Sequence, residues 1–111
     1  MAAVSEVWIV EPLEGKTKAE QSKRLIEWRD QFLSEGASSI TIYEGGYGMF
    51  EGTWAFCINH ASAEAWGKMQ DKYGSEPETF DTVLESWQST PVLKIKSSGM
   101  LHYSESLSKE A

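Results

Sequence analysis

The sequence contains little of what characterises disulfide-bonded, membrane-spanning or nucleic-acid-binding proteins. Its one cysteine, Cys57, cannot form a disulfide within the chain. No apolar stretch approaches the roughly 20 residues of a membrane-spanning helix, and the first residues lack the pattern of a secretion signal. Positive charge is also scarce: 10 Lys and Arg stand against 17 Asp and Glu, so the net charge is −7 and a phosphate backbone is repelled. We therefore expect a cytoplasmic protein that binds neither membranes nor nucleic acid.

What the chain does contain is enough for one packed domain. Its 111 residues suit a single core, and 41% of them are hydrophobic and 12% aromatic. The last residues are polar, with little to hold them in place. We expect one domain over residues 1–111, with a frayed tail at about 106–111.

Four segments rich in β-branched and aromatic residues predict strands. They span 4–13, 38–44, 53–60 and 92–97, and the residues after Gly99 are a candidate extension of the last one.

Two helical regions lie between these segments. Thr17 and Glu20 have the spacing of an N-terminal capping box, and Gly36 stands where a helix ends in the left-handed conformation. The first helix has its apolar stripe at Leu25, Trp28 and Phe32. The second region starts at Ser62 and is broken around 74–77. Its second half carries an apolar stripe at Phe80, Val83, Leu84 and Trp87.

The resulting order, βαββαβ, is the split βαβ pattern of ferredoxin-like folds. It predicts an α+β protein whose antiparallel sheet has its helices on one face. Alternation along the strands predicts which side chains meet the helices. The bulky sets should do so: Trp54, Phe56 and Ile58 in the third strand and Leu93 and Ile95 in the fourth.

The opposite, open face should carry a semi-polar set of side chains: Thr41, Tyr43, Ala55, Cys57 and Asn59. The first strand is apolar on both sides, with Val7 and Ile9 on one and Trp8 and Val10 on the other. Such a strand is covered on both sides. A chain of this size cannot cover both faces of its own sheet, whereas a second copy can. We therefore expect a homodimer formed through the sheet faces.

This pattern resembles the dimeric α+β barrel superfamily, which includes the antibiotic-biosynthesis monooxygenases, the stress-responsive barrel proteins and the NIPSNAP-like domains. The resemblance covers roughly residues 4–105 and rests on the element order, the hairpin that ends in Gly52-Thr53-Trp54, and the run INHASAEAWGKMQDKY. It implies pairing sheet to sheet and a cavity between the sheet and the helices or loops of each protomer.

The stretch YEGGYGMFEGTW, from Tyr43 to Trp54, is rich in glycine. Its G-x-G-x-x-x-G spacing is one residue longer than a dinucleotide fingerprint, and a strand follows it instead of a helix. It therefore predicts a hairpin, not a nucleotide site. Its apolar residues Tyr47, Met49 and Phe50 would cover the mouth of a pocket or contact a second subunit.

The candidate catalytic residues are Asn59 and His60 at the end of the third strand and Trp66 in the second helix. His60 could act as a general base, or it could form a hydrogen bond near the cap at Ser62. Trp66 would line the cavity if the resemblance extends to it; otherwise it belongs to the core.

The candidate ligand-binding residues are Tyr43, Cys57, Trp54, Tyr47 and Phe50. We expect no metal, because His60 and His102 have no H-x-x-H or C-x-x-C partner. Haem is not expected either, since the haem-binding relatives need a histidine in the segment 61–88, which contains none. No cofactor is therefore predicted.

Three functions remain open. The aromatic content and the lack of a catalytic motif favour a dimer that binds a small apolar or aromatic molecule. The resemblance suggests, as an alternative, a cofactor-independent monooxygenase that acts on an aromatic substrate. The third is a structural or partner-binding dimer.

Overall fold

The computed structural model describes residues 3–75 and 85–109. These form an α+β fold with a four-stranded antiparallel sheet, as predicted. The elements, in order, are β1 Val4–Pro12, α1 Lys18–Ser34, β2 Ser39–Glu44, β3 Trp54–His60, α2 Ala63–Ser75 and β4 Leu93–His102. Residues 85–89 are also helical. The predicted stripe residues Phe80, Val83 and Leu84 lie outside the described residues.

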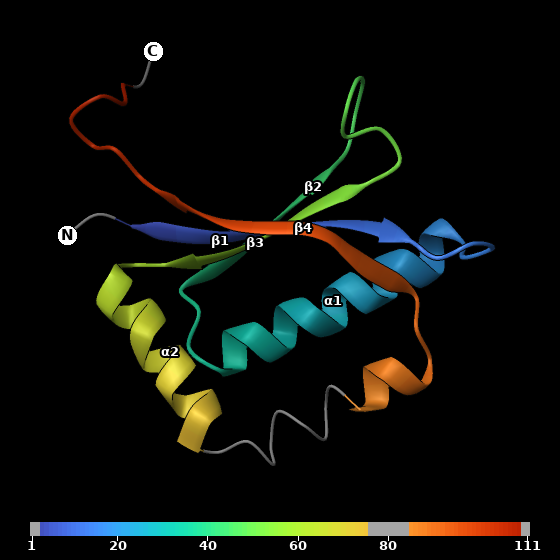
Figure 1. Cartoon of the computed structure of the whole chain (residues 1–111), viewed down its shortest axis with the longest axis horizontal. Helices are drawn as coiled ribbons and strands as arrows, with labels where there is room; N and C mark the ends of the chain where they lie inside the picture. Colours follow the sequence, from blue (N-terminus) through green and yellow to red (C-terminus); the bar gives the residue numbers. More distant parts are fainter. Residues whose placement is uncertain (1–2, 76–84, 110–111) are drawn as a thin grey trace.

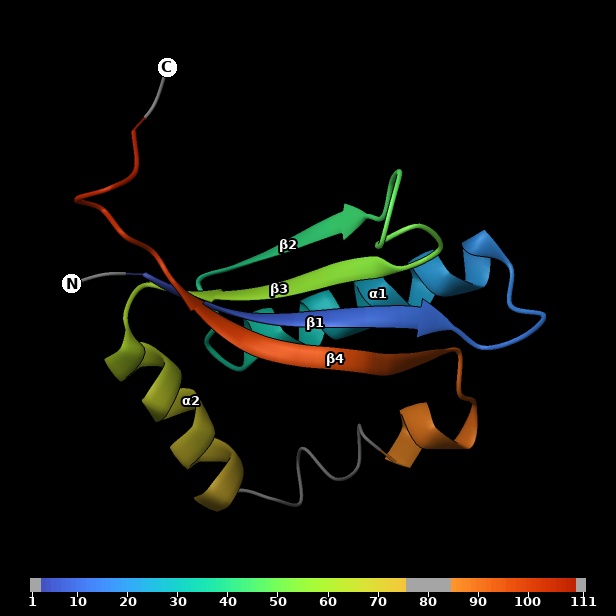
Figure 2. The same ribbon diagram turned by 45° about the horizontal axis from the view of Figure 1, so that its top comes forward.

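The sheet has the strand order β2-β3-β1-β4, and every neighbouring pair is antiparallel. This order is compatible with the predicted ferredoxin-like arrangement. Both helices lie on one side of the sheet, and its other side is open (Figure 1). Figure 2 shows the four strands side by side with α1 beneath them. No helix among the described residues is long and apolar enough to cross a membrane.

Local signals at both ends of α1 match the sequence prediction. The backbone N–H of Glu20 donates to Thr17 Oγ1 at 3.2 Å, and the N–H of Thr17 donates to Glu20 Oε1 at 3.2 Å. At the other end Gly36 has a backbone φ of +115°, a value that residues with a Cβ rarely adopt. The capping box and the glycine end are therefore confirmed.

The core lies between the sheet and α1. Trp8 packs edge-on against Trp28 and Phe32, with ring centroids 5.9 and 5.3 Å apart, and stacks on Phe56 at 5.8 Å. Phe56 and Ile58 are fully buried and Trp54 packs against the same cluster, as alternation predicts. Trp8 and Val10 also contact this core, so Val7 and Ile9 face the open side.

The fourth strand includes the candidate extension after Gly99, but it is less buried than predicted. β4 continues through Gly99 to His102. Leu93 is in the core as expected, but Ile95, predicted to pack on the helices, is 51% exposed. β4 is an edge strand, and its pairing with β1 shifts register between Ile9 and Val10. Ile95 therefore has a strand on only one flank, which leaves its side chain accessible.

Candidate functional site

The open face of the sheet carries no net charge. Register and alternation place fourteen residues on it, of which only Glu11 and Lys94 are charged. The other twelve are Ser5, Val7, Ile9, Ser39, Thr41, Tyr43, Ala55, Cys57, Asn59, Ser97, Gly99 and Leu101. None of them is acidic or basic, although the chain carries a net charge of −7. At the margin, Glu11 and Lys94 form an ion pair at 3.1 Å, which neutralises both.

One half of this face is an apolar hollow of about 350 Å³. Its apolar and aromatic lining residues are Val7, Ile9, Tyr43, Phe50, Ala55, Cys57 and Leu101. Glu44 also borders it, and its carboxylate is paired with Lys18. The small Ala55 lies opposite the large Tyr43 in the register of β2 and β3, which leaves space beside the tyrosine ring. The hollow thus combines an aliphatic floor with aromatic walls.

The wall formed by Phe50 depends on the glycine loop, residues 45–53. The Gly45 N–H donates to the Thr53 carbonyl at 2.8 Å, and a Cβ at Gly45 would meet the carbonyl oxygens of Phe50 and Thr53. Gly48 and Gly52 have φ of +96° and +79°. These glycines let the loop close tightly between two antiparallel strands. The prediction of a hairpin is confirmed.

The other half of the open face is polar. Asn59 is its centre: its Oδ1 accepts from the Ser5 hydroxyl at 2.6 Å, and its Nδ2 donates to Ser39 Oγ at 3.1 Å and Thr41 Oγ1 at 2.8 Å. The amide is therefore bonded across three strands. Its hydrogen-bonding capacity is largely used within the protein, so Asn59 orders this half of the face.

His60 lies on the opposite side of the sheet from Asn59, because adjacent strand residues alternate. It is 1% exposed, and neither ring nitrogen has a hydrogen-bond partner among residues 3–75 and 85–109. The expected bond near the Ser62 cap is absent, since Ser62 Oγ accepts from the Ala65 N–H instead. Burial lowers the pKa of His60, and the nearby negative charge of Glu6 opposes this effect only in part.

Glu6 joins two tryptophans on this helix side. Its Oε2 accepts from Trp8 Nε1 at 2.8 Å, and its Oε1 accepts from Trp66 Nε1 at 3.0 Å. The second bond connects β1 to α2 across 60 residues of sequence. The sequence prediction overlooked Glu6, although an acidic residue on the same side of the strand as Trp8 and Val10 is a detectable signal.

The predicted ligand-binding residues separate into two groups. Tyr43, Cys57 and Phe50 all line the apolar hollow. Trp54 points to the helix side, and Tyr47 is fully exposed at the tip of the loop. Burial raises the pKa of the Cys57 thiol, so it remains protonated and behaves as an apolar part of the floor.

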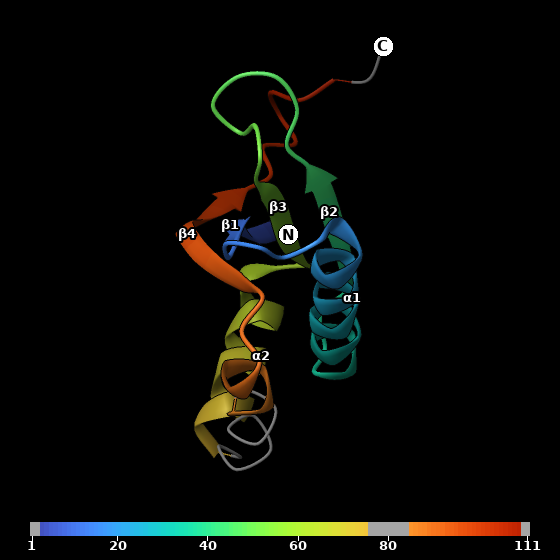
Figure 3. The same ribbon diagram turned by 90° about the vertical axis from the view of Figure 1, so that its right-hand side faces the viewer.

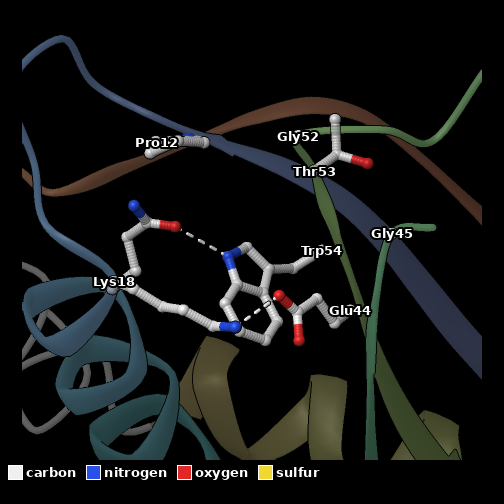
Figure 4. A pocket seen from close by; sticks show the side chains of 8 residues that line it. Pro12, Lys18, Glu44, Gly45, Gly52, Thr53 and Trp54 are labelled. Carbon is white, nitrogen blue, oxygen red and sulfur yellow. Dashed lines mark hydrogen bonds and ion pairs between the residues drawn. The ribbon is translucent and has the colours of Figure 1, made fainter. Parts of the chain in front are cut away.

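Trp54 borders a second, smaller hollow of about 230 Å³ near the start of α1 (Figure 4). There Trp54 Nε1 donates to Gln21 Oε1 at 2.9 Å, and Lys18 Nζ lies 2.6 Å from Glu44 Oε1. The polar groups of this hollow bond to each other, so it is a less suitable site for a ligand than the apolar one.

Among the described residues, no group of three or more His, Cys, Asp or Glu side chains could hold a metal ion. Comparisons of the chain with known proteins found no matching family model, no similar curated protein and no similar solved structure. The resemblance to dimeric α+β barrels therefore stays a prediction from the residues themselves.

Proposed function

We propose that the protein is a homodimeric α+β barrel that binds a small, largely apolar or aromatic molecule in the hollow of its open face. The observation that carries this proposal is the hollow itself: about 350 Å³ lined by aliphatic and aromatic side chains. Ligand sites of this type usually measure about 300–1,000 Å³. The hollow is at the lower end of that range, which favours a ligand with one or two rings.

Tyr43 supplies the polar component of the site. Its ring forms a wall of the hollow and its side chain remains accessible. A phenol combines an apolar body with a group that donates and accepts hydrogen bonds, which can orient a ligand without an ionic contact. A neutral ligand is therefore favoured over a charged one.

The homodimer rests on the open face, which carries no net charge. Two copies of a chain with net charge −7 repel each other wherever their acidic surfaces meet. The open face avoids this cost, and its aliphatic residues Val7, Ile9 and Leu101 gain from being covered. A two-fold interface requires a patch that contacts itself, and a face without net charge meets this condition.

The monooxygenase alternative has less support in the geometry. His60 and Trp66 lie on the helix side, whereas Asn59 lies on the open face. The His60 nitrogens are covered by surrounding atoms, so a substrate in the apolar hollow could not reach them.

The test is a titration with 2-naphthol, a small neutral aromatic probe, followed by its fluorescence. We expect saturable binding, and at least about tenfold weaker binding by Ala55→Phe, because the new ring fills the hollow. Ser39→Phe is the matched control: it adds the same ring to the same face at the polar end, and affinity should be retained. Absence of saturable binding, or equal losses in both variants, would contradict the proposal.

A further inference from the structure

We propose that in the homodimer the C-terminal tail of one copy (residues 103–109) packs on the glycine loop (residues 45–53) of the other and closes its hollow. This inference rests on the proposed homodimer and names what completes the binding site. In it, the partner subunit supplies the outer wall that a single chain leaves open.

The two segments project from the same side of the sheet. Figure 1 shows the glycine loop and the tail rising on the side opposite the helices, near opposite ends of the strands. In Figure 3 both again rise on the side away from the helices. The open face therefore has a projecting segment at each end, the glycine loop at one and the tail at the other; we call these two segments the arms. A second copy placed on this face must fit between the arms or contact them.

Both arms carry large apolar side chains that their own chain leaves exposed. Tyr47 is fully exposed and Met49 is 83% exposed on the loop, while Leu107 is 86% exposed and Tyr103 more than half exposed on the tail. Exposed apolar residues gathered on projecting segments are typical of interaction sites. Their burial against each other would remove both surfaces from water at once.

The tail has the backbone order needed for such a contact. The Tyr103 N–H donates to the Ala3 carbonyl at 2.9 Å, which fixes the start of the tail beside β1. The Ser108 N–H donates to the Ser104 carbonyl at 3.0 Å, which closes a turn that carries Leu107. Leu107 is therefore displayed on a hydrogen-bonded turn.

The direction of the two-fold axis then determines whether each loop meets the partner's tail or the partner's loop. An axis between the faces that runs across the strands exchanges the two ends of the sheet, so each loop meets the partner's tail. An axis along the strands keeps loops at one end and tails at the other. The hollow lies under the loop, where Phe50 already forms one wall. Only the first axis brings the tail, with Tyr103 and Leu107, to the uncovered flank of that hollow.

Cysteine cross-linking distinguishes these arrangements. In the Cys57→Ser background the chain has no other cysteine, so Met49→Cys and Leu107→Cys are introduced into separate chains and the two proteins are mixed under mild oxidation. We expect disulfide-linked pairs that join one chain of each kind, and few pairs of like chains. Met49→Cys chains that link mainly to each other would show the loop-to-loop arrangement and overturn the proposal.

A second measurement does not depend on cysteine. Leu107→Ser should raise the dimer dissociation constant about tenfold or more in sedimentation experiments, because burial of a leucine is lost. Ser108→Ala, on the same turn, should leave it unchanged. A protein that stays monomeric but binds 2-naphthol overturns this inference and leaves ligand binding intact. An unmodified protein, with Cys57 in place, that sediments as a dimer but binds no probe contradicts ligand binding alone.

Discussion

On the helix side of the sheet, Trp8, Phe56 and Ile58 are packed against α1; on the open side, Val7, Tyr43 and Leu101 have no covering layer in the described chain. The same strands supply both sets, and the same alternation separates them. The helix side holds an aromatic cluster with centroids 5.3–6.0 Å apart. The open side is hollowed, and its charged residues Glu11 and Lys94 pair with each other at the margin. Stability of the fold should therefore depend on one face, and binding on the other.

The most direct test of this comparison is to substitute neighbouring residues that point to opposite faces. Phe56→Ala should lower the free energy of unfolding by about 3–5 kcal/mol, since it leaves a cavity in the aromatic cluster. Ala55→Ser, one residue away on the open face, should cost less than about 1 kcal/mol. Urea unfolding at a fixed protein concentration measures both. Similar losses would show that the two faces contribute equally to the fold.

A second prediction concerns Arg24, which is buried on α1. Its guanidinium donates to the carbonyl oxygens of Trp87 at 3.2 Å and Thr90 at 2.8 Å, and so ties the chain before β4 to α1. Arg24→Ala leaves these acceptors unpaired and should cost about 2–3 kcal/mol. Arg29→Ala is the matched control, because the pair of Arg29 with Asp30 is exposed and worth about 1 kcal/mol or less. Equal costs in urea unfolding would contradict the anchoring role of Arg24.

The third prediction uses the pKa of His60, which burial lowers in the folded protein. The unfolded chain then binds the proton more tightly, with a pKa of about 6.5, so stability is full above that pH and falls as the pH drops through it. The slope for one proton is at most about 1.4 kcal/mol per pH unit.

His60→Leu should flatten this dependence between about pH 7.5 and 5.5. Thermal unfolding across this pH range is the measurement. If stability depends on pH as steeply in His60→Leu as in the unmodified protein, other groups cause the dependence.

The smallest expected effect on stability concerns Leu101, which lies on the open side of the sheet. Leu101→Ser removes an exposed apolar side chain from the hollow and should change the stability of the fold by about 0.5 kcal/mol or less. The same change should weaken 2-naphthol binding and self-association. A large loss of stability in dilute protein would place Leu101 in the core of the fold instead.

Most secondary structure could be predicted because its causes are local. The capping box at Thr17, the end of α1 at Gly36 and the alternation in β3 each depend on residues within a few positions of one another. The glycine loop was predictable as a hairpin for the same reason. The exposure of Ile95 was not, because it follows from the edge position of β4 and a register shift that adjacent residues do not encode.

The candidate site, too, could be predicted from the sequence only in part. That Tyr43 and Cys57 share the open face follows from alternation within each strand. Their meeting with Leu101 in one hollow requires the pairing of β4 with β1. Asn59 and His60 are adjacent in sequence, and the prediction treated them as one site; the strand turns them to opposite faces.

By itself, then, the sequence determined the elements, their caps, and the semi-polar set of side chains on the open face, because these depend on spacing along the chain. Only the tertiary structure decided that β1 buries Trp8 and exposes Val7, and that Glu6 receives the indole N–H of Trp66. Both follow from which surface the helices cover, and that surface is selected by packing among residues far apart in sequence.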